Sequence, residues 1–321
     1  MELIRGLQNI RPEHHGCVAT IGNFDGVHVG HQAVLGQLAE EASSLGLPSV
    51  VITFEPYPQE FFLKENLPSR LTRFREKMQL LRRYAVDRVL CLRFDRSFAS
   101  MKAENFIQQV LVSGLGIRYL VVGDDFRFGF RRQGDLSMLK AAGREFKFKV
   151  VNMHAFNIEG ARVSSTRVRE SLIAGEISTA EKLLGHAYRM AGKVAYGDGR
   201  GRTIGFPTAN IALNRRVTPL SGVFAVEVFG IENEPLKGVA NIGVRPTVDG
   251  SKCLLEVHLF EFDGNIYGKH IQIEFLKKIR DEKRFDSVDA LIKQINLDVK
   301  QARAYFGSRM DCADAFPVSG Y

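Results

Sequence analysis

The chain has 321 residues, of which 45% are hydrophobic and 25% charged, and its formal net charge at pH 7 is +8. This composition is typical of a globular protein and excludes disordered or collagen-like chains. No run approaches the roughly 18 apolar residues of a membrane-spanning helix, and the N-terminus lacks the apolar core of a secretion signal. The net positive charge favours anionic ligands. The lysines and arginines are scattered along the sequence, which argues against dedicated nucleic-acid binding.

The four cysteines stand alone at positions 17, 91, 253 and 312. Because none forms a CxxC pair, a zinc or redox motif is not expected. Structural thiols in a reducing compartment are the simplest interpretation, so we expect a cytoplasmic protein. The sequence gives no indication of an oligomeric state.

Residues 1–185 are expected to form one of two domains, since about 150 residues per domain is usual. Short apolar runs at 18–22, 50–54, 89–92, 119–123 and 148–151 alternate with helical patterns, for example at Val34, Leu35, Leu38 and Ala42 and at Phe106, Ile107, Val110 and Leu111. This alternation predicts an α/β domain with a Rossmann-like parallel sheet covered on both faces. Ligand sites in such sheets lie at the carboxyl ends of the strands.

Residues 186–321 have a different pattern. After a short helix predicted at 179–184, with a capping box from Ser178, strand-like runs follow at 189–195, 208–213, 223–229, 238–242, 254–261 and 270–275. They predict a Greek-key β-barrel, with a sandwich as the alternative. A terminal helix, capped by Asp286 or Ser287, is predicted to pack on the barrel through Val288, Leu291, Ile292, Ile295, Val299 and Ala302. The tail 311–321 is expected to be disordered.

The segment GNFDGVHVGH, residues 22–31, follows the first predicted strand and opens a helix. Its glycines permit close approach of the backbone to a ligand, and a helix N-terminus with two imidazoles suits a phosphate group. Two alternatives stay open: a metal site with Asp25 as a third ligand, and a structural turn.

Three further segments end strands of the same predicted sheet. VSSTRVR, residues 163–169, offers hydroxyls and Arg169 at a helix start and predicts a second phosphate clamp, or simple helix capping. TFEPYP, residues 53–58, is a rigid proline loop, and GDDFRFG, residues 123–129, offers carboxylates and rings for a ribose and a flat ligand. Taken singly, either could be an ordinary surface loop.

The second half contains its own candidate site. The glycine-rich and basic stretch 197–210 predicts a loop that cradles an anion, although it lacks the Walker A order. Thr208 and Asn210 are oxygen donors suited to Mg²⁺. Glu256 shares a strand face with Leu254 and His258, and we expect its carboxylate inside the barrel, where it could accept a proton. A solvated, outward-facing glutamate is the alternative.

Together these motifs resemble the family of bacterial bifunctional riboflavin kinase/FMN adenylyltransferases over residues 1–307. GNFDGVHVGH, TFEPYP, GDDFRFG and VSSTRVR stand in this order in the first half. GRGRTIGFPTANI, GVANIGVRPT, LEVHLF and the last helix follow in the second, and PTAN is the most specific element.

The resemblance implies that the second domain phosphorylates riboflavin with ATP and that the first transfers AMP from another ATP to FMN, releasing pyrophosphate and giving FAD. It implies Glu256, His28, His31 and Arg169 as catalytic residues and Thr208 and Asn210 as ligands of Mg²⁺. The implied nucleotide contacts are Gly22, Asn23, Phe24, Gly30, Ser164, Ser165, Thr166, Gly199, Gly201, Arg202, Thr208 and Asn210. The implied flavin contacts are Pro56, Pro58, Asp125, Phe126 and Phe128.

Position 125 departs from the pattern, because some relatives have an asparagine where this chain has Asp125, which puts its role in doubt. The expected partners are riboflavin, FMN and ATP, with no nucleic acid. The alternatives are a kinase with a degenerate first domain, a different nucleotidyltransferase, and a flavin- or RNA-binding protein without activity.

Overall fold

The computed structural model describes residues 1–63, 67–197, 201, 204–213, 215, 217–247 and 250–314. The chain divides into two compact units, Met1–Pro68 with Thr72–Ser165, and Ser69–Leu71 with Thr166–Tyr321. This division falls nearer the N-terminus than the expected border at 185/186. It groups most of α7 (Ser165–Ala174) and all of α8 (Ile177–Leu184) with the second unit.

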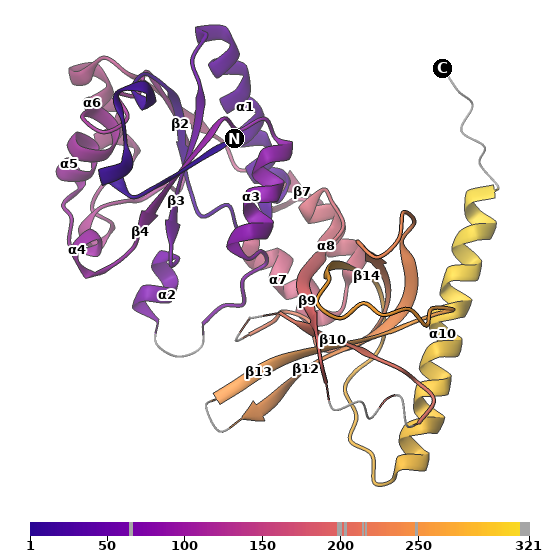
Figure 1. The fold of residues 1–321 in the computed structure, drawn as a ribbon. Coiled ribbons are helices and arrows are strands. Elements are labelled where there is room, and N and C mark those ends of the chain that lie inside the picture. The colour runs from indigo at the N-terminus through magenta and orange to yellow at the C-terminus, as the bar shows by residue number, and fades with distance from the viewer. Residues whose placement is uncertain are drawn as a thin grey trace. The chain divides into compact units, whose positions relative to one another are not determined.

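The first unit is built on a parallel sheet of six strands (Figure 1). Its strands are β1 (Glu2–Arg5), β2 (Val18–Ile21), β3 (Ser49–Glu55), β4 (Arg88–Arg93), β5 (Tyr119–Gly123) and β6 (Lys149–Met153), in the order β1-β4-β3-β2-β5-β6. The five predicted strands are therefore confirmed. The strand order reverses between β2 and β5, and such a switch point is where open α/β sheets bind ligands.

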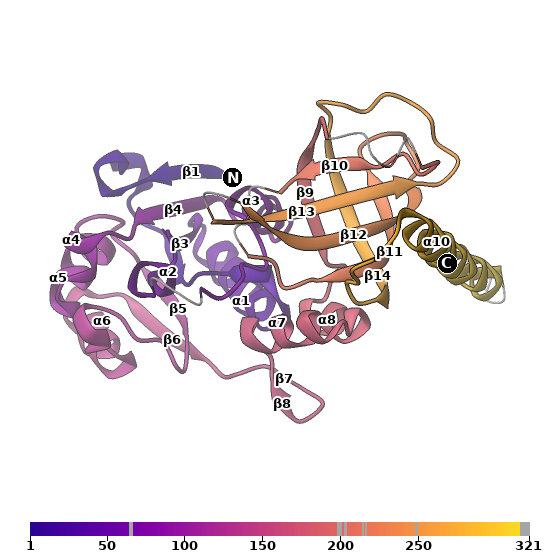
Figure 2. The same cartoon turned by 90° about the horizontal axis from the view of Figure 1, so that it is seen from below.

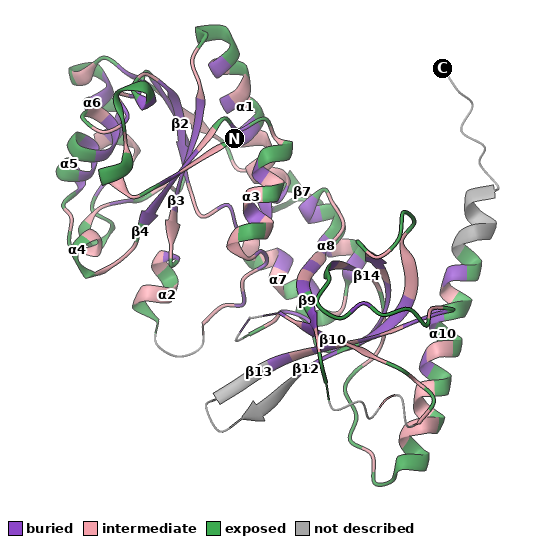
Figure 3. Cartoon of the chain, in the orientation of Figure 1, coloured by how far each residue is buried: buried purple, intermediate pink, exposed green. Residues whose placement is uncertain are grey.

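Both faces of this sheet are covered, which explains the continuous apolar runs (Figure 3). Alternate strand residues point to opposite faces: Ala19 and Ile21 pack in one core, and Val18 packs in the other. The helices α1 (Val29–Leu45) and α3 (Phe74–Arg83) cover the Val18 side. The opposite face is covered by α5 (Ala103–Phe106), the π-helical turn at Ile107–Val112 and α6 (Leu136–Phe146).

Several short elements complete the first unit. They are α2 (Pro58–Phe62), α4 (Arg96–Ala99), the antiparallel pair β7 (Asn157–Ile158) and β8 (Ala161–Arg162), and 3₁₀ turns at Leu7–Asn9, Pro12–His14, Asp25–Val27 and Phe130–Arg132.

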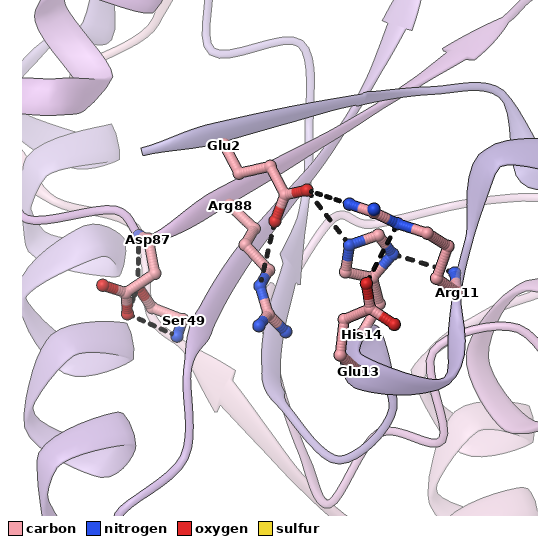
Figure 4. A network of polar contacts seen from close by, with 7 residues as sticks. All are labelled: Glu2, Arg11, Glu13, His14, Ser49, Asp87 and Arg88. Atoms are coloured by element: carbon pink, nitrogen blue, oxygen red, sulfur yellow. Dashed lines mark hydrogen bonds and ion pairs between the residues drawn. The ribbon is translucent and has the colours of Figure 1, made fainter.

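Strand β1 was not predicted, because its four residues include two charged ones and lie at the sheet edge. Its first residue, Glu2, is held by a polar network (Figure 4). The Glu2 carboxylate contacts Arg11 at 2.9 Å, the buried His14 ring at 3.2 Å and Arg88 at 3.5 Å. Burial raises the pKa of Glu2, but His14 and Arg11 outweigh that effect and lower it overall. The polar contacts with Arg11, His14 and Arg88 thus help to hold a strand whose apolar run is only two residues long.

The second unit contains a closed antiparallel barrel (Figure 2). Its strands are β9 (Arg189–Ala195), β10 (Ala209–Ala212), β11 (Gly222–Phe229), β12 (Leu236–Thr247), β13 (Gly250–Leu259) and β14 (His270–Arg280), in the order β10-β13-β12-β11-β14-β9. Strands β11, β12 and β13 are consecutive neighbours, and β10 returns beside β13, which is a Greek key. The predicted barrel is confirmed and the sandwich is not.

The terminal helix α10 (Val288–Asp314) packs on the outside of the barrel wall. Val299 and Ala302 pack with the wall residues Val223 and Val239, as the helical spacing predicts, and Phe306 joins them. The prediction is wrong for Val288, which is 60% exposed at the first turn of the helix. Ser287 Oγ accepts a hydrogen bond from the Ala290 N–H and caps the helix. The expected disorder from 311 is wrong as far as Asp314, because α10 continues to there, and 315–321 lie outside the described residues.

Helix α8 begins at Ile177, two residues before the predicted start. Its N-cap is Glu176 and no side chain caps it, so the capping box at Ser178 is wrong. Ile177 is buried, and its packing draws the first turn into the helix ahead of the serine.

Candidate active sites

The GNFDGVHVGH segment forms a loop and the first turn of α1 at the carboxyl end of β2. His28 is the N-cap of α1, and its Nδ1 accepts a hydrogen bond from the His31 N–H at 3.3 Å. The two imidazole rings stack with centroids 3.6 Å apart. A Cβ at Gly30 would meet the His28 ring at 3.3 Å, so this glycine makes room for the stacked pair.

The loop before α1 has an unusual backbone. Phe24, Gly26 and Val27 all have positive φ, and for Phe24 and Val27 this conformation is strained. Such strain persists only where the surroundings impose it, and it gathers at functional sites. The buried Asp25 supplies part of that support: its Oδ1 accepts hydrogen bonds from the Thr72 N–H, the Thr72 hydroxyl and the Tyr57 hydroxyl at 3.0, 3.2 and 3.4 Å.

This geometry makes Asp25 a structural anchor. Its Oδ1 accepts all three hydrogen bonds, from Tyr57 and Thr72, which favours a structural role over the alternative of a metal ligand. No group of three His, Cys, Asp or Glu side chains suited to a metal occurs in the part of the chain that the structure describes.

Replacing Asp25 by alanine is expected to destabilise the first unit by about 2–4 kcal/mol, because three buried donors lose a charged acceptor. Denaturant titration, followed by a probe in the first unit, measures this change in the free energy of unfolding. The exposed Glu40 on α1 provides the control, and Glu40→Ala should change stability by less than about 0.5 kcal/mol. Equal stability of Asp25→Ala and the parent chain would show that the loop is held by other contacts.

The electrostatics of the site favour a neutral His31 ring. Burial lowers the pKa of His31 well below its usual value, and the positive charges of His28 and Lys77 lower it further. Because His28 Nδ1 accepts the backbone hydrogen bond, a neutral His28 carries its proton on Nε2. His31 is therefore neutral at neutral pH, and each ring keeps an N–H that can donate a hydrogen bond.

Phe24 does not reach a ligand with its side chain. It is 2% exposed, belongs to the core beneath α1, and its ring lies 4.9 Å from that of His31. A Cβ at Gly22 would meet this ring at 3.1 Å. Both residues thus support the histidine pair, and any contact with a nucleotide would come from their backbone.

The structure brings one residue of the VSSTRVR segment to the first motif: the Ser165 hydroxyl donates to the Asp25 carbonyl at 2.9 Å. Ser164 is half-buried beside it in the same unit. Thr166 and Arg169 belong to the second unit, where Arg169 Nε donates to the Ser69 carbonyl at 2.6 Å. Their expected place on the nucleotide phosphates stays a prediction.

The loops after β3 and β5 carry the expected flavin contacts. Phe126 and Phe128 stack with centroids 5.6 Å apart, and Phe128 is buried whereas Phe126 is half-buried. Asp125 is exposed and pairs with Arg162 of β8 at 2.8 Å. Pro56 is exposed and Pro58 opens α2. A flat ligand would therefore meet Phe126 before Phe128.

The second unit holds a cavity of about 560 Å³ on the outer side of the barrel wall. Thr208, Asn210 and Glu256 all line it, together with Gly201. Glu256 pairs across the strands with Asn210 of β10 on one side and with Asn241 of β12 on the other. Leu254 and His258 share its face, as alternation predicts, and they also line the cavity.

The expectation that Glu256 lies inside the barrel is wrong. Its strand neighbours Leu255 and Val257 fill the interior and are almost fully buried. Glu256 therefore faces the other way, towards the cavity that Leu291 and Ile295 of α10 also line. The alternative of a fully solvated glutamate does not hold either, because this side chain is half-buried.

Part of the glycine-rich loop covers this cavity. A Cβ at Gly197 would collide with the Asn210 amide, and one at Gly201 would lie 2.9 Å from Thr208 Oγ1. The loop thus needs glycine to approach both polar side chains. Gly199 and Arg202, two of the expected nucleotide contacts, lie outside the described residues.

Sequence reasoning missed the opposite wall of the cavity. Arg280 at the end of β14 forms two hydrogen bonds from Nε and one from Nη2 to the buried Asp298 of α10, between 2.8 and 3.1 Å. Gln294 donates to the same carboxylate at 2.9 Å. The only signal was an acidic residue on the apolar face of the last helix. Asn241, which stood in GVANIGVRPT, was also not singled out.

A switch-point site on a Rossmann-like unit, followed by a barrel whose cavity gathers a carboxylate, a hydroxyl and an amide, defines a two-site enzyme of nucleotide chemistry. Family models agree: FAD synthetase matches residues 10–167 and riboflavin kinase matches residues 184–306. The chain belongs to the family of bifunctional riboflavin kinase/FMN adenylyltransferases.

Relatives from three bacteria bear that name. The protein of Escherichia coli K12 is 51% identical over 308 residues, covering 96% of this chain and 98% of its own. Those of Haemophilus influenzae and Pseudomonas fluorescens are 49% and 50% identical and cover 96% and 95% of this chain, and 100% and 97% of their own.

A crystal structure from Streptococcus pneumoniae, titled as a macrolide-efflux protein, superposes with a TM-score of 0.81 at 32% identity. The match covers 94% of this chain and 99% of that one. No helix in the described ranges is long and apolar enough to cross a membrane. The chain has the two activities of its family, phosphorylation of riboflavin and adenylylation of FMN, in the expected order of modules.

Proposed function

We propose that the cavity of the second unit is the riboflavin kinase site and that Glu256 is its general base. The observation that carries this assignment is the convergence of Thr208, Asn210 and Glu256 on one cavity. In this proposal the Glu256 carboxylate takes the proton of the ribityl 5′-hydroxyl while its oxygen bonds to the γ-phosphorus of ATP. The bond from that phosphorus to the β-phosphate oxygen breaks, and ADP leaves.

The cavity also fits Mg²⁺, since the Thr208 hydroxyl and the Asn210 amide offer neutral oxygen donors beside a carboxylate on its wall. When bound, the ion would neutralise charge on the ATP phosphates. The glycine-rich loop would hold the phosphates with its backbone N–H groups, with Gly199 and Arg202 as predicted contributors. The apolar side chains Leu291 and Ile295 suit the flavin ring.

We assign adenylyl transfer to the histidine motif of the first unit. An oxygen of the FMN phosphate attacks the α-phosphorus of ATP, and the bond to the β-phosphate oxygen breaks to release pyrophosphate. FMN is already an anion, so the step needs no base. The step is difficult because negative charge gathers on the phosphates, and N–H donors of His28, His31 and the start of α1 would stabilise that charge. Asn23, Ser164, Ser165, Thr166 and Arg169 are the further predicted phosphate contacts, and Pro56, Pro58, Asp125, Phe126 and Phe128 the predicted flavin contacts.

Cytoplasmic placement and the absence of a nucleic-acid partner remain part of this proposal. Burial raises the pKa of the Cys17 thiol to about 12, and it raises the pKa values of Cys91 and Cys253. All three cysteines are unpaired, which suits a reducing compartment.

The direct test is to incubate the protein with riboflavin, ATP and Mg²⁺ and to separate the flavins by chromatography over time. FMN should appear first and FAD should follow. FMN without FAD would mean that the first unit is degenerate, and neither product would overturn the assignment. Supplying FMN in place of riboflavin isolates the second step.

A further inference from the structure

Lys77 is a lysine in a place where helices normally bury apolar residues. It lies one turn before Leu81 on the buried face of α3, and its side chain is fully buried. Burying an ammonium group is costly, and an apolar side chain of the same length would fill the space at lower cost. The position of its charge therefore calls for a reason beyond packing.

The ammonium group lies against the loop of the histidine motif. Lys77 Nζ donates to the Asn23 carbonyl at 3.0 Å and to the Thr53 hydroxyl at 3.1 Å. It lies 4.6 Å from the centre of the Tyr57 ring. Asn23 directly precedes the strained residue Phe24, so Lys77 fixes the point where the loop leaves its ordinary backbone conformation.

Lys77 is also electrostatically coupled to the histidine pair, because its charge is one of the causes of the lowered pKa of His31. An anion held by this pair and by the start of α1 would feel the same field. In a site removed from water such a charge acts over several ångströms.

We propose that Lys77 is a positioning residue for adenylyl transfer: its buried ammonium fixes the Asn23 carbonyl and supplies positive charge beneath the phosphate-binding motif. This inference rests on the proposed placement of the ATP phosphates at the histidine motif. Lys77 then helps to hold the triphosphate and to stabilise the negative charge that develops on it during the reaction. It has no role towards the flavin ring.

The test is Lys77→Met in the full chain, which keeps the length of the side chain and removes its charge. The kcat/KM for FAD formation from FMN should fall about 100-fold, as it does when one charge-stabilising group is lost. The Kd for ATP at this site should rise with FMN binding unchanged. Riboflavin phosphorylation by the second unit should stay within about twofold of the parent chain, because that site uses none of these residues.

Thr53→Val is the matched control, since it removes one hydrogen bond of the ammonium and keeps the charge. It should change FAD formation by less than about threefold. NMR titration gives a second reading: the pKa of His31 should rise in Lys77→Met, where a neighbouring cation is lost, and stay unchanged in Thr53→Val.

Three results would overturn the proposal. They are FAD formation in Lys77→Met within about threefold of the parent chain, equal losses in Lys77→Met and Thr53→Val, and a parallel loss of kinase activity, which would make Lys77 a folding residue. If FAD formation survives loss of both His28 and His31, the placement of the phosphates fails instead, whatever Lys77→Met shows.

Discussion

Glu256→Gln should abolish FMN formation while FAD formation from supplied FMN continues at the parent rate. Glutamine keeps the shape and polarity of the side chain but cannot take the proton of the ribityl hydroxyl. Loss of a general base costs about 10²- to 10⁴-fold in kcat. The KM for riboflavin should change little, because glutamine still faces the cavity between Asn210 and Asn241.

Phosphorylation and adenylylation are measured separately, with riboflavin and ATP in one assay and FMN and ATP in the other. Glu261→Gln is the control: this glutamate lies just after the same strand, is exposed and pairs with Arg303 at the surface. It should leave both activities within about twofold, since exposed ion pairs contribute little. A Glu256→Gln chain that still makes FMN at the parent rate would remove Glu256 as the base.

The candidate site of the second unit shows what a sequence can and cannot predict. Alternation placed Leu254, Glu256 and His258 on one face correctly, because side chains on a strand must alternate. It could not say which face was outside, since a barrel wall packed by α10 is apolar on both sides. The Arg280–Asp298 pair was out of reach for the same reason: partners 18 residues apart meet only once α10 has docked.

In the first unit the local signals were stronger. The strands are buried on both faces and therefore read as apolar runs, and the order of motifs matched a known family. What the sequence hid were long-range polar contacts: Asp25 to Thr72, Lys77 to Asn23, and Glu2 to His14. Lysine and aspartate are usually exposed, so nothing local distinguishes a buried one. The first two of these contacts hold the strained loop at Phe24–Val27, and the third holds the edge strand β1. Backbone strain cannot be recognised from the composition of the sequence.

Removing both imidazoles, by His28→Ser with His31→Ala, should abolish FAD formation and leave FMN formation within about twofold. Serine at position 28 can still cap α1, so the cost of about 0.5–2 kcal/mol for losing a helix cap is avoided. In the proposed assignment two donors to the phosphates are lost, and each such donor is worth about 10²- to 10³-fold in rate. FAD should therefore fall below detection in the assay with FMN and ATP. His15→Ala is the control, because His15 is exposed and precedes β2, away from the carboxyl end.

The pH dependence of stability distinguishes a neutral His31 donor from a ring that gains and loses a proton near neutral pH. Folded His31 takes up a proton only well below pH 6.5, whereas the unfolded chain does so near 6.5. The unfolded state therefore binds more protons below pH 6.5, and stability is lost as the pH falls from 6.5 through the lowered pKa. Denaturant titrations of the first unit should show this loss in the parent chain and a smaller one in His31→Ala. A His31 resonance that titrates near pH 6.5 would mean that the ring is charged when it meets the nucleotide, and the neutral-donor description would then be wrong.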